Sequence, residues 1–227
     1  MEQTTLQRLT DVSDPAWPHV QQMFTEATNS IEVLLPPPQE ERNQSLLGTG
    51  VTLRSTLGAI VYHTGGLLID GGWVRVLGAG HPRLPRSLPV WNSGRASGFM
   101  LVADDVVGGF FALDGGAFAA PDGNAFYFAP DSLRWEPIGT GYSGLIRFLC
   151  SGDIALFYKD MRWPGWREEI ASLRGDQALS LYPFPWTVQG KDLQHVSRKP
   201  VPIAEVFSMS LDIAHQLDAP DESAKPN

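Results

Sequence analysis

The sequence is poor in the residues that bind metals through sulfur and nitrogen. It holds one cysteine, Cys150, and five scattered histidines with no HxH, HExxH or CxxC spacing. A single cysteine cannot form an intramolecular disulfide, and the missing spacings leave a zinc site without support. Cys150 ends the apolar run 145–150, so we expect it to be a small buried hydrophobic residue.

Positive charge and long apolar runs are also scarce. The chain has 17 Lys and Arg against 25 Asp and Glu, a formal net charge of -8. Nucleic-acid binding relies on clustered Lys and Arg, so we expect no nucleic-acid partner, whereas an acidic chain suits a basic protein partner. No apolar run approaches the roughly 18 residues that span a bilayer, so we expect no membrane partner. The first residues, MEQTTLQRLTDVSD, lack the pattern of a signal peptide, which favours a cytoplasmic location.

Phosphate-binding and nucleophile motifs are missing as well. The glycine pairs that begin at positions 65, 71, 108 and 115 form neither GxGxxG nor GxxxxGK[ST], and hairpin turns explain them. Gly141-Tyr142-Ser143-Gly144 resembles a nucleophile elbow, but its second glycine comes one position early. Ser143 is therefore expected to cap a helix. We predict no cofactor and no metal, and we favour a protein that is not an enzyme.

The sequence is rich in short apolar runs separated by Asp and Gly. The runs 99–103, 110–113 and 125–129 carry the aromatic and branched residues typical of half-buried strands. The clusters between them are turn residues, because Gly accepts positive φ and Asp bonds its own backbone. Short turns join antiparallel neighbours, so these runs predict a meander, with a fourth strand at 133–136.

Helices and a second hairpin surround this meander. Gly71-Gly72 between the runs 67–70 and 73–77 predicts a two-residue hairpin. The polar residues 39–44 are expected to be exposed, and the proline-rich stretch 82–92 to be irregular or to form one helical turn. Apolar spacing and end signals predict helices at 15–27, 55–65, 141–152, 153–157, 164–174 and 202–217, and a last strand at 178–182.

Together these elements predict a single α+β domain with a predominantly antiparallel or mixed sheet flanked by helices. At 227 residues the chain has the length of one large domain or two small ones, and we favour one. Its 43% hydrophobic and 19% charged residues allow a sizeable core. We assign residues 1–217 to the domain and expect the acidic tail 218–227 to be disordered, because it can bury little apolar surface.

Acids and aromatics supply the candidate site residues. Asp104, Asp105, Asp114 and Asp131 could gather oxygen ligands for Ca²⁺ or Mg²⁺, but their spacing matches no calcium loop. Each stands where a turn favours Asp, so we interpret all four as turn residues. A second group of aromatics bracketed by prolines could line a groove or an interface, although core packing is the more common use: Trp163, Trp166, Tyr182, Phe184 and Trp186.

Several longer strings resemble a known family. They are TGGLLIDGGWVRVLGAG (64–80), LPRSLPVWN (84–92), VADDVVGGFFALDGG (102–116), YFAPDSLRWEP (127–137) and RWPGW (162–166). They resemble the bacterial domain-of-unknown-function family two-six-two-five over nearly the whole chain except the acidic tail. More distantly, the order of helix, Gly-Gly, short strands and an Asp-rich hairpin ending in FFALD is similar to the SUKH superfamily. That superfamily includes immunity proteins against polymorphic toxins and eukaryotic regulatory scaffolds. The resemblance implies an α+β domain that binds another protein, and it carries over no catalytic residue.

The favoured hypothesis is a cytoplasmic protein-binding domain, an immunity or regulatory protein of the SUKH type. It depends on the resemblance, on the acidic charge that suits a basic partner such as a toxin domain, and on the lack of a complete catalytic set. We place the partner surface at Asp104, Asp105, Trp163 and Trp166.

The alternative hypothesis is a small-ligand-binding protein or a hydrolase. Clustered carboxylates with raised pKa values can do acid–base chemistry without a sequence motif. The residues of such a site would be Asp104, Asp105, Asp131 and His63.

Overall fold

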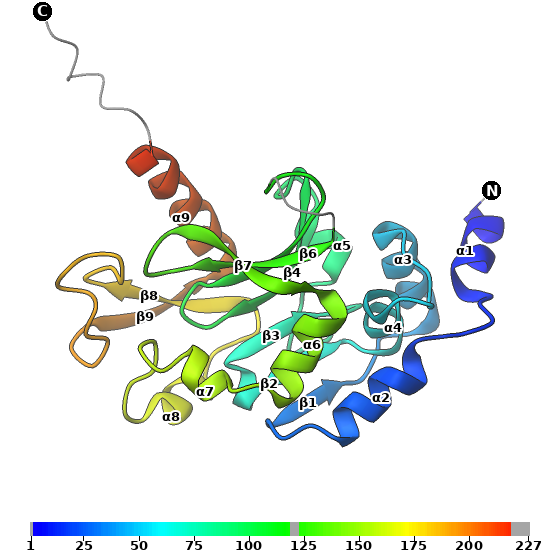
Figure 1. Cartoon of the computed structure of the whole chain (residues 1–227), viewed down its shortest axis with the longest axis horizontal. Helices are drawn as coiled ribbons and strands as arrows, with labels where there is room; N and C mark the ends of the chain where they lie inside the picture. Colours follow the sequence, from blue (N-terminus) through cyan, green and yellow to red (C-terminus); the bar gives the residue numbers. More distant parts are fainter. Residues whose placement is uncertain (1, 119–122, 219–227) are drawn as a thin grey trace, which may run out of the picture.

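The computed structural model describes residues 2–118 and 123–218 of the chain. Within this part, seven strands form one sheet in chain order, and each strand is antiparallel to the next. They are β1 Ile31–Leu34, β2 Gly66–Ile69, β3 Val74–Leu77, β4 Phe99–Asp105, β5 Phe110–Asp114, β6 Asn124–Ala129 and β7 Arg134–Gly141. A separate antiparallel hairpin joins β8 Gln177–Tyr182 to β9 Ser197–Pro202 (Figure 1). The fold is α+β with an antiparallel meander, as predicted.

The meander has the predicted strands at its centre. The three apolar runs form β4, β5 and β6, and the fourth predicted strand is the start of β7. The hairpin between β2 and β3 differs in one detail, because Ile69 pairs with Val74 and the connection therefore has four residues. Asp70 with φ 50° and Gly71 with φ 71° open a 3-10 turn (η1, Asp70–Gly72) in it. The prediction of a two-residue connection was wrong because Asp70 and Trp73 also belong to the turn.

Nine helices lie in the described ranges. They are α1 Glu2–Thr10, α2 Trp17–Thr25, α3 Gln39–Thr49, α4 Thr56–His63, α5 Leu88–Asn92, α6 Tyr142–Ser151, α7 Ile154–Phe157, α8 Trp166–Ile170 and α9 Ile203–Asp218. Local signals explain several ends: the Ser55 hydroxyl accepts a bond from the Gly58 amide at α4, and the Asp153 carboxylate accepts one from Leu156 at α7.

Some elements were not predicted from the sequence. The N-terminal helix α1, the edge strands β1 and β9 and the helix α3 are absent from the sequence interpretation. Residues 39–44, predicted to be polar and exposed, are exposed or partly buried and begin α3, whose acids Glu40 and Glu41 stand in the first turn. The helix α8 ends at Ile170, four residues before the predicted end.

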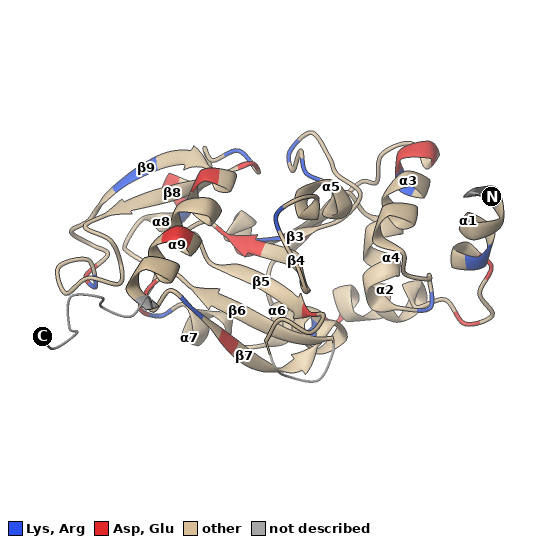
Figure 2. Ribbon diagram, turned by 90° about the horizontal axis from the view of Figure 1, so that it is seen from above, with Lys and Arg blue, Asp and Glu red and all other residues tan. Residues whose placement is uncertain are grey.

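The two faces of the sheet carry different layers. Phe110 and Phe111 are neighbours on β5 and therefore point to opposite faces. Phe110 packs edge-on against Phe207 of α9, with ring centroids 4.9 Å apart, and Phe111 packs on Phe157 of α7. Figures 1 and 2 place α1 to α4 at one end of the molecule, and β8, β9 and α9 at the other.

A contiguous apolar core connects these layers. It includes buried residues of the large sheet, of α2, α4 and α6, and of β8 and α9. Cys150 of α6 is buried in it, as predicted. Within the described ranges, no helix is both long and apolar enough to cross a membrane. Residues 219–227, which make up most of the tail predicted to be disordered, lie outside the described residues.

Candidate functional site

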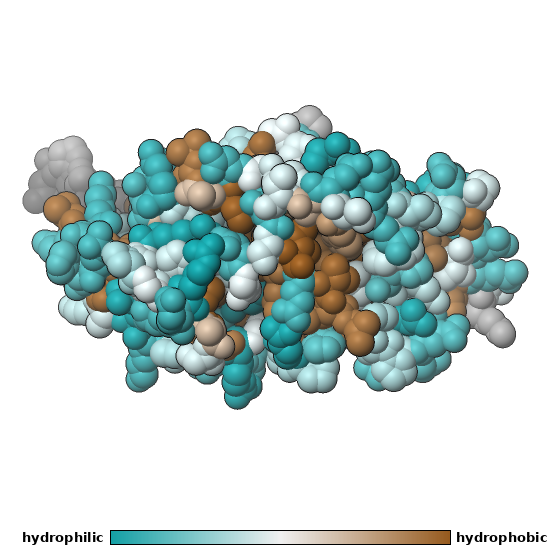
Figure 3. Space-filling view, turned by 90° about the horizontal axis from the view of Figure 1, so that it is seen from below, coloured by the Kyte–Doolittle hydropathy of each residue, from teal (hydrophilic) through white to brown (hydrophobic). Residues whose placement is uncertain are grey.

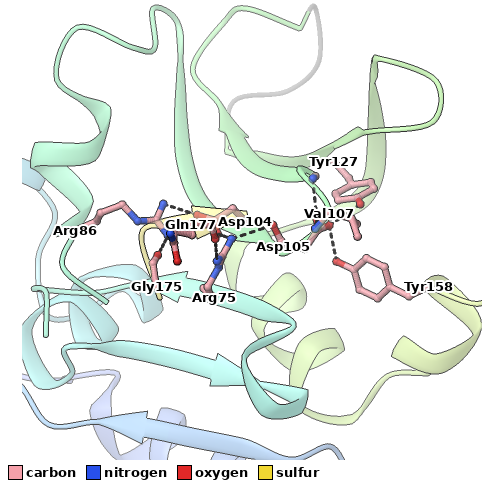
Figure 4. A network of polar contacts seen from close by, with 10 residues as sticks. Arg75, Arg86, Asp104, Asp105, Val107, Tyr127, Tyr158, Gly175 and Gln177 are labelled. Carbon is pink, nitrogen blue, oxygen red and sulfur yellow. Dashed lines mark hydrogen bonds and ion pairs between the residues drawn. The ribbon is translucent and has the colours of Figure 1, made fainter. Parts of the chain in front are cut away.

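Asp104, near the end of β4, holds two buried arginines. Its Oδ1 lies 2.6 Å from Arg75 Nη2, and its Oδ2 lies 2.6 Å from Arg86 Nη1 (Figure 4). Arg75 stands directly opposite Asp104 in the pairing of β3 with β4, so the sheet itself brings these two together. Arg86 arrives from the proline-rich stretch before α5. Two cations therefore share one carboxylate inside the protein.

The same two guanidinium groups bind backbone carbonyls of a distant segment. Arg86 Nη2 donates to the Gly175 carbonyl at 2.7 Å, and Arg75 Nη1 donates to the Gln177 carbonyl. Arg75 Nη2 also donates to the Asp105 carbonyl at 2.9 Å. This polar centre attaches the start of β8 to the large sheet.

The electrostatics of Arg75 are those of a buried cation. Burial is the largest cause acting on the pKa of Arg75, and it lowers that pKa. The charge of Asp104 raises the pKa, and the charge of Arg86 lowers it further. The Nε atoms of both arginines are buried and have no hydrogen-bond partner in the described part of the chain. The positive charge in this centre is therefore only partly compensated.

Asp105 faces away from the arginines and binds a different set of donors. Its Oδ2 accepts from Tyr127 Oη at 2.7 Å and from Tyr158 Oη at 3.1 Å, and its Oδ1 accepts from the amides of Val107 and Gly109 (Figure 4). Burial raises the pKa of Asp105, and these four hydrogen bonds act in the opposite direction. A side chain at position 109 would collide with Tyr127 Oη and Asp105 Oδ2, which explains the glycine.

Trp163 and Trp166 pack against Trp73 in a cluster of tilted and edge-to-face rings beside the β2–β3 turn. The Arg162 guanidinium lies 4.8 Å from the ring centroid of Trp73 and 4.4 Å from that of Trp166. Asp70 in the turn binds Arg162 at 2.8 Å, and Trp163 Nε1 donates to Glu169 at 2.7 Å. The RWPGW string therefore anchors the segment before α8 to the sheet.

The structure places all four predicted contact residues inside the protein. Asp104 and Asp105 are 0% exposed, Trp163 is 3% exposed and Trp166 is 8% exposed. These buried side chains do not form an exposed contact surface. The sequence interpretation took the acids for surface turns because the arginines and tyrosines that enclose them are distant in the chain.

The interpretation of the acids as turn residues is correct for three of four positions. Asp105 binds the amides of its own turn, Asp114 Oδ1 accepts from Gly116 and Phe118, and Asp131 is exposed in the turn before β7. It is wrong for Asp104, whose carboxylate binds two arginines.

In the described part of the chain, no hydrogen bond or ion pair joins the residues of the alternative site to one another, although the charge of Asp131 raises the pKa of Tyr127, which donates to Asp105. His63 stacks on Trp17, with ring centroids 4.6 Å apart. Burial is the larger cause that lowers the pKa of His63, and the positive charge of Arg42 lowers it further. Asp131 lies in an exposed turn, far along the chain from Asp104 and Asp105. Within the described ranges, no three His, Cys, Asp or Glu side chains lie where they could hold a metal ion.

Ser143 is not a helix cap. The N-terminal cap of α6 is Gly141, without a side-chain bond, and the Ser143 hydroxyl instead lies 2.7 Å from the hydroxyl of Thr56 at the start of α4. Its role is to join two helices.

Comparison with known proteins identifies the family. The family model described as "Protein of unknown function DUF2625" matches residues 6–206. The chain belongs to this family. It is 40% identical to the uncharacterized protein YbfG of Escherichia coli strain K12 over 210 residues, which cover 90% of this chain and 94% of that protein. It is also 34% identical to an uncharacterized protein of Haemophilus influenzae over 186 residues, 79% of this chain and 81% of the relative.

In this member of the DUF2625 family, exposed apolar residues gather beside β1. A groove of about 650 Å³ is lined by Leu35, which is 76% exposed, and by Val90, which is 69% exposed. Five prolines line the same groove: Pro36, Pro37, Pro38, Pro82 and Pro85. We call the groove lined by these residues the proline groove. Figure 3 shows apolar side chains near the middle of the lower face of the molecule, the side on which β1 lies in Figure 1.

The strand β1 that leads into the proline groove is an edge of the DUF2625 sheet. In the described part of the chain it pairs only with β2, and its apolar Val33 is exposed. The other edge, β7, carries Arg134, Glu136 and Pro137, and the hairpin strand β9 carries two cations and two prolines. Charges and prolines hinder strand addition, and β1 carries one charged residue, Glu32, and no proline.

Proposed function

We propose that this protein is a cytoplasmic protein-binding domain that binds an extended, apolar segment of a protein partner in the proline groove. The single observation that carries the proposal is the exposure of Leu35 and Val90 on the same groove. The SUKH resemblance supports a binding role, with a toxin that is neutralised, or a regulated protein, as the partner.

The apolar residues of the groove favour a protein partner on energetic grounds. Burying a side chain of this size stabilises a complex by about 1.5–3 kcal/mol. Large contiguous apolar patches are uncommon on the surfaces of monomeric proteins and mark interaction sites. The prolines keep the groove walls stiff, so little conformational entropy is lost when a partner binds.

The edge strand supports an extended form of the bound segment. Alternate residues of β1 direct their N–H and C=O groups away from β2, as in any antiparallel edge strand. A partner strand that pairs with β1 would satisfy these groups and place its alternate side chains beside Val33 and Leu35.

Charge supports a basic partner. The chain carries a net charge of -8, and Glu41, which lines the groove, stands with Glu40 in the first turn of α3 (Figure 2). Arg86 also lines the groove, but it is buried and bound to Asp104, so Glu41 and the net charge of the chain favour a segment in which basic residues flank apolar ones.

The test is quantitative affinity purification of the tagged protein from its own cells, with recovered proteins measured by mass spectrometry. The groove variant is Leu35→Asp with Val90→Asp. The control is Val188→Asp with Leu217→Asp, which adds the same charge at two equally exposed apolar residues elsewhere.

We expect a stoichiometric protein that the wild type and the control recover, and that the groove variant loses by at least about tenfold, a difference of about 1.4 kcal/mol. Equal recovery by both variants, or no stoichiometric partner at about 50 or 200 mM salt, contradicts the proposal.

A further inference from the structure

We propose that a second cavity of this protein, which we call the arginine cleft, binds a small organic anion, an oxyanion group carried on an apolar body. The cleft has a volume of about 530 Å³, and Arg75, Arg83 and Arg174 line it. Pro82 and Pro85 line both the arginine cleft and the proline groove, so the loop that carries them separates the two cavities.

Charge is the first argument. Three arginines and no Asp or Glu are among the described residues that line the cleft. Arg75 is almost fully buried, shares Asp104 with Arg86, and has an Nε without a hydrogen-bond partner in the described part of the chain. A cation that is desolvated and only partly compensated gains from an anion placed nearby.

The two other arginines keep donors that a ligand could use. Arg83 binds Glu32 through Nη1, and among the described residues its Nε and Nη2 have no hydrogen-bond partner. Arg174 binds Asp176 through Nε at 3.0 Å and Nη2 at 2.5 Å, and its Nη1 has no hydrogen-bond partner within the described ranges. A guanidinium has five N–H donors, so each ion pair holds its arginine in place and leaves donors for an oxyanion.

Size and walls define the rest of the ligand. Small-molecule pockets commonly measure about 300–1,000 Å³ and combine apolar walls with a few polar groups, and the arginine cleft fits this description. Its apolar walls come from Leu68 of β2, Ile170 of α8 and Leu173. A bare inorganic ion would leave these walls without contact, which favours a ligand with an apolar body.

The experiment titrates the purified full chain with benzoate, phenyl phosphate, inorganic phosphate and the neutral benzamide at constant ionic strength. Binding is measured by calorimetry and by amide chemical shifts in ¹H–¹⁵N spectra. The cleft variant is Arg83→Gln with Arg174→Gln. The control, Arg54→Gln with Arg134→Gln, removes the same charge at two exposed arginines that do not line the cleft.

We expect the two aromatic anions to bind and benzamide not to bind, with shifts at Gly71, Gly72 and Gly175. The cleft variant should bind at least about tenfold more weakly, and the control within about twofold of wild type. The aromatic anion that binds more tightly, benzoate or phenyl phosphate, identifies whether the cleft prefers a carboxylate or a phosphate group.

Three results would overturn the proposal: no anion binds, benzamide binds equally well, or both variants lose affinity alike. If circular dichroism shows that the cleft variant does not fold, the amide chemical-shift changes of the wild type provide the test. Shift changes at residues away from the cleft would refute the site. The groove variant Leu35→Asp with Val90→Asp is expected to keep anion binding, so failure of the proposed function leaves this test intact.

Discussion

At the scale of single residues, two adjacent acids on one strand have different roles. Successive side chains of a strand point to opposite faces, so Asp104 meets Arg75 and Arg86 while Asp105 meets Tyr127 and Tyr158. One acid compensates buried cations, and the other accepts hydrogen bonds from phenols that burial keeps protonated by raising their pKa.

The first prediction concerns the buried cations. Asp104→Asn removes the carboxylate shared by Arg75 and Arg86 and leaves both charges buried without a counterion. We expect the free energy of unfolding to fall by about 3–5 kcal/mol. Urea unfolding measures it. Asp131→Asn at an exposed turn is the control, with an expected change within about 0.5 kcal/mol. Similar values for the two variants would refute an essential role of the ion pairs.

The second prediction concerns pH. Burial raises the pKa of Asp105 in the folded state above the value near 3.8 of an exposed Asp. Because the pKa of Asp105 is higher in the folded state than in the unfolded state, its carboxyl group stabilises the fold fully below pH 3.8. This stabilisation is lost as the pH rises through the folded-state pKa. Asp105→Asn removes this titration.

The quantity to measure is the stability of the wild type minus that of Asp105→Asn, by urea unfolding across this pH range. We expect the difference to fall as the pH rises from about 4 to 7, since the wild type loses the contribution and the variant does not. A difference that rises with pH would mean that the hydrogen bonds from the two tyrosines and two amides outweigh burial and lower the pKa.

The residue scale is where sequence interpretation was weakest. Arg86 and Asp104 are 18 positions apart, and Arg75 and Asp105 are 30 apart. Local turn chemistry explained Asp105 and Asp114 correctly, since their partners are amides two and four residues away. The ion pairs of Asp104 depend on strand pairing, which no local pattern encodes.

At the scale of elements, the ends of helices follow local chemistry where a polar side chain reaches the first turn. Ser55 caps α4 by accepting from the Gly58 amide at 2.9 Å, as the sequence predicted. Ser143 had an equally favourable residue type but bonds to Thr56 of another helix. The difference arises because tertiary packing offers Ser143 a competing partner.

The third prediction tests this cap. Ser55→Ala leaves an amide of the first turn of α4 without its acceptor, and we expect the free energy of unfolding to fall by about 0.5–2 kcal/mol. Ser151→Ala, at the exposed last position of α6, is the control and should change stability by less than about 0.5 kcal/mol. The measurement is the thermal unfolding midpoint of each variant. Equal midpoints for Ser55→Ala and Ser151→Ala would show that the cap contributes nothing to stability.

At the scale of the whole molecule, the core joins both sheets and the C-terminal helix. Phe207 of α9 packs on Phe110 of the large sheet, while Leu179 of β8 donates its amide to the Val106 carbonyl at 2.7 Å. Buried residues of all these elements form a contiguous cluster. The hairpin β8–β9 and α9 should therefore not unfold separately from the large sheet.

The fourth prediction follows from this core. We expect the transitions reported by far-ultraviolet circular dichroism and by tryptophan fluorescence to coincide in urea. Phe207→Ala removes a buried ring and should shift both probes together, with a loss of about 3–5 kcal/mol. Two separated transitions, or a shift in one probe only, would indicate independently folding parts instead of one domain.

The sequence by itself determined the central meander, most of the helices, the burial of Cys150 and the family. Runs of apolar residues, turn residues and helix caps act over a few positions, so they can be recognised in the chain. Only the tertiary structure decided whether the candidate site residues are accessible, because their burial depends on partners brought together from distant elements. It enclosed Asp104, Asp105, Trp163 and Trp166, and it exposed Leu35 and Val90 on the proline groove.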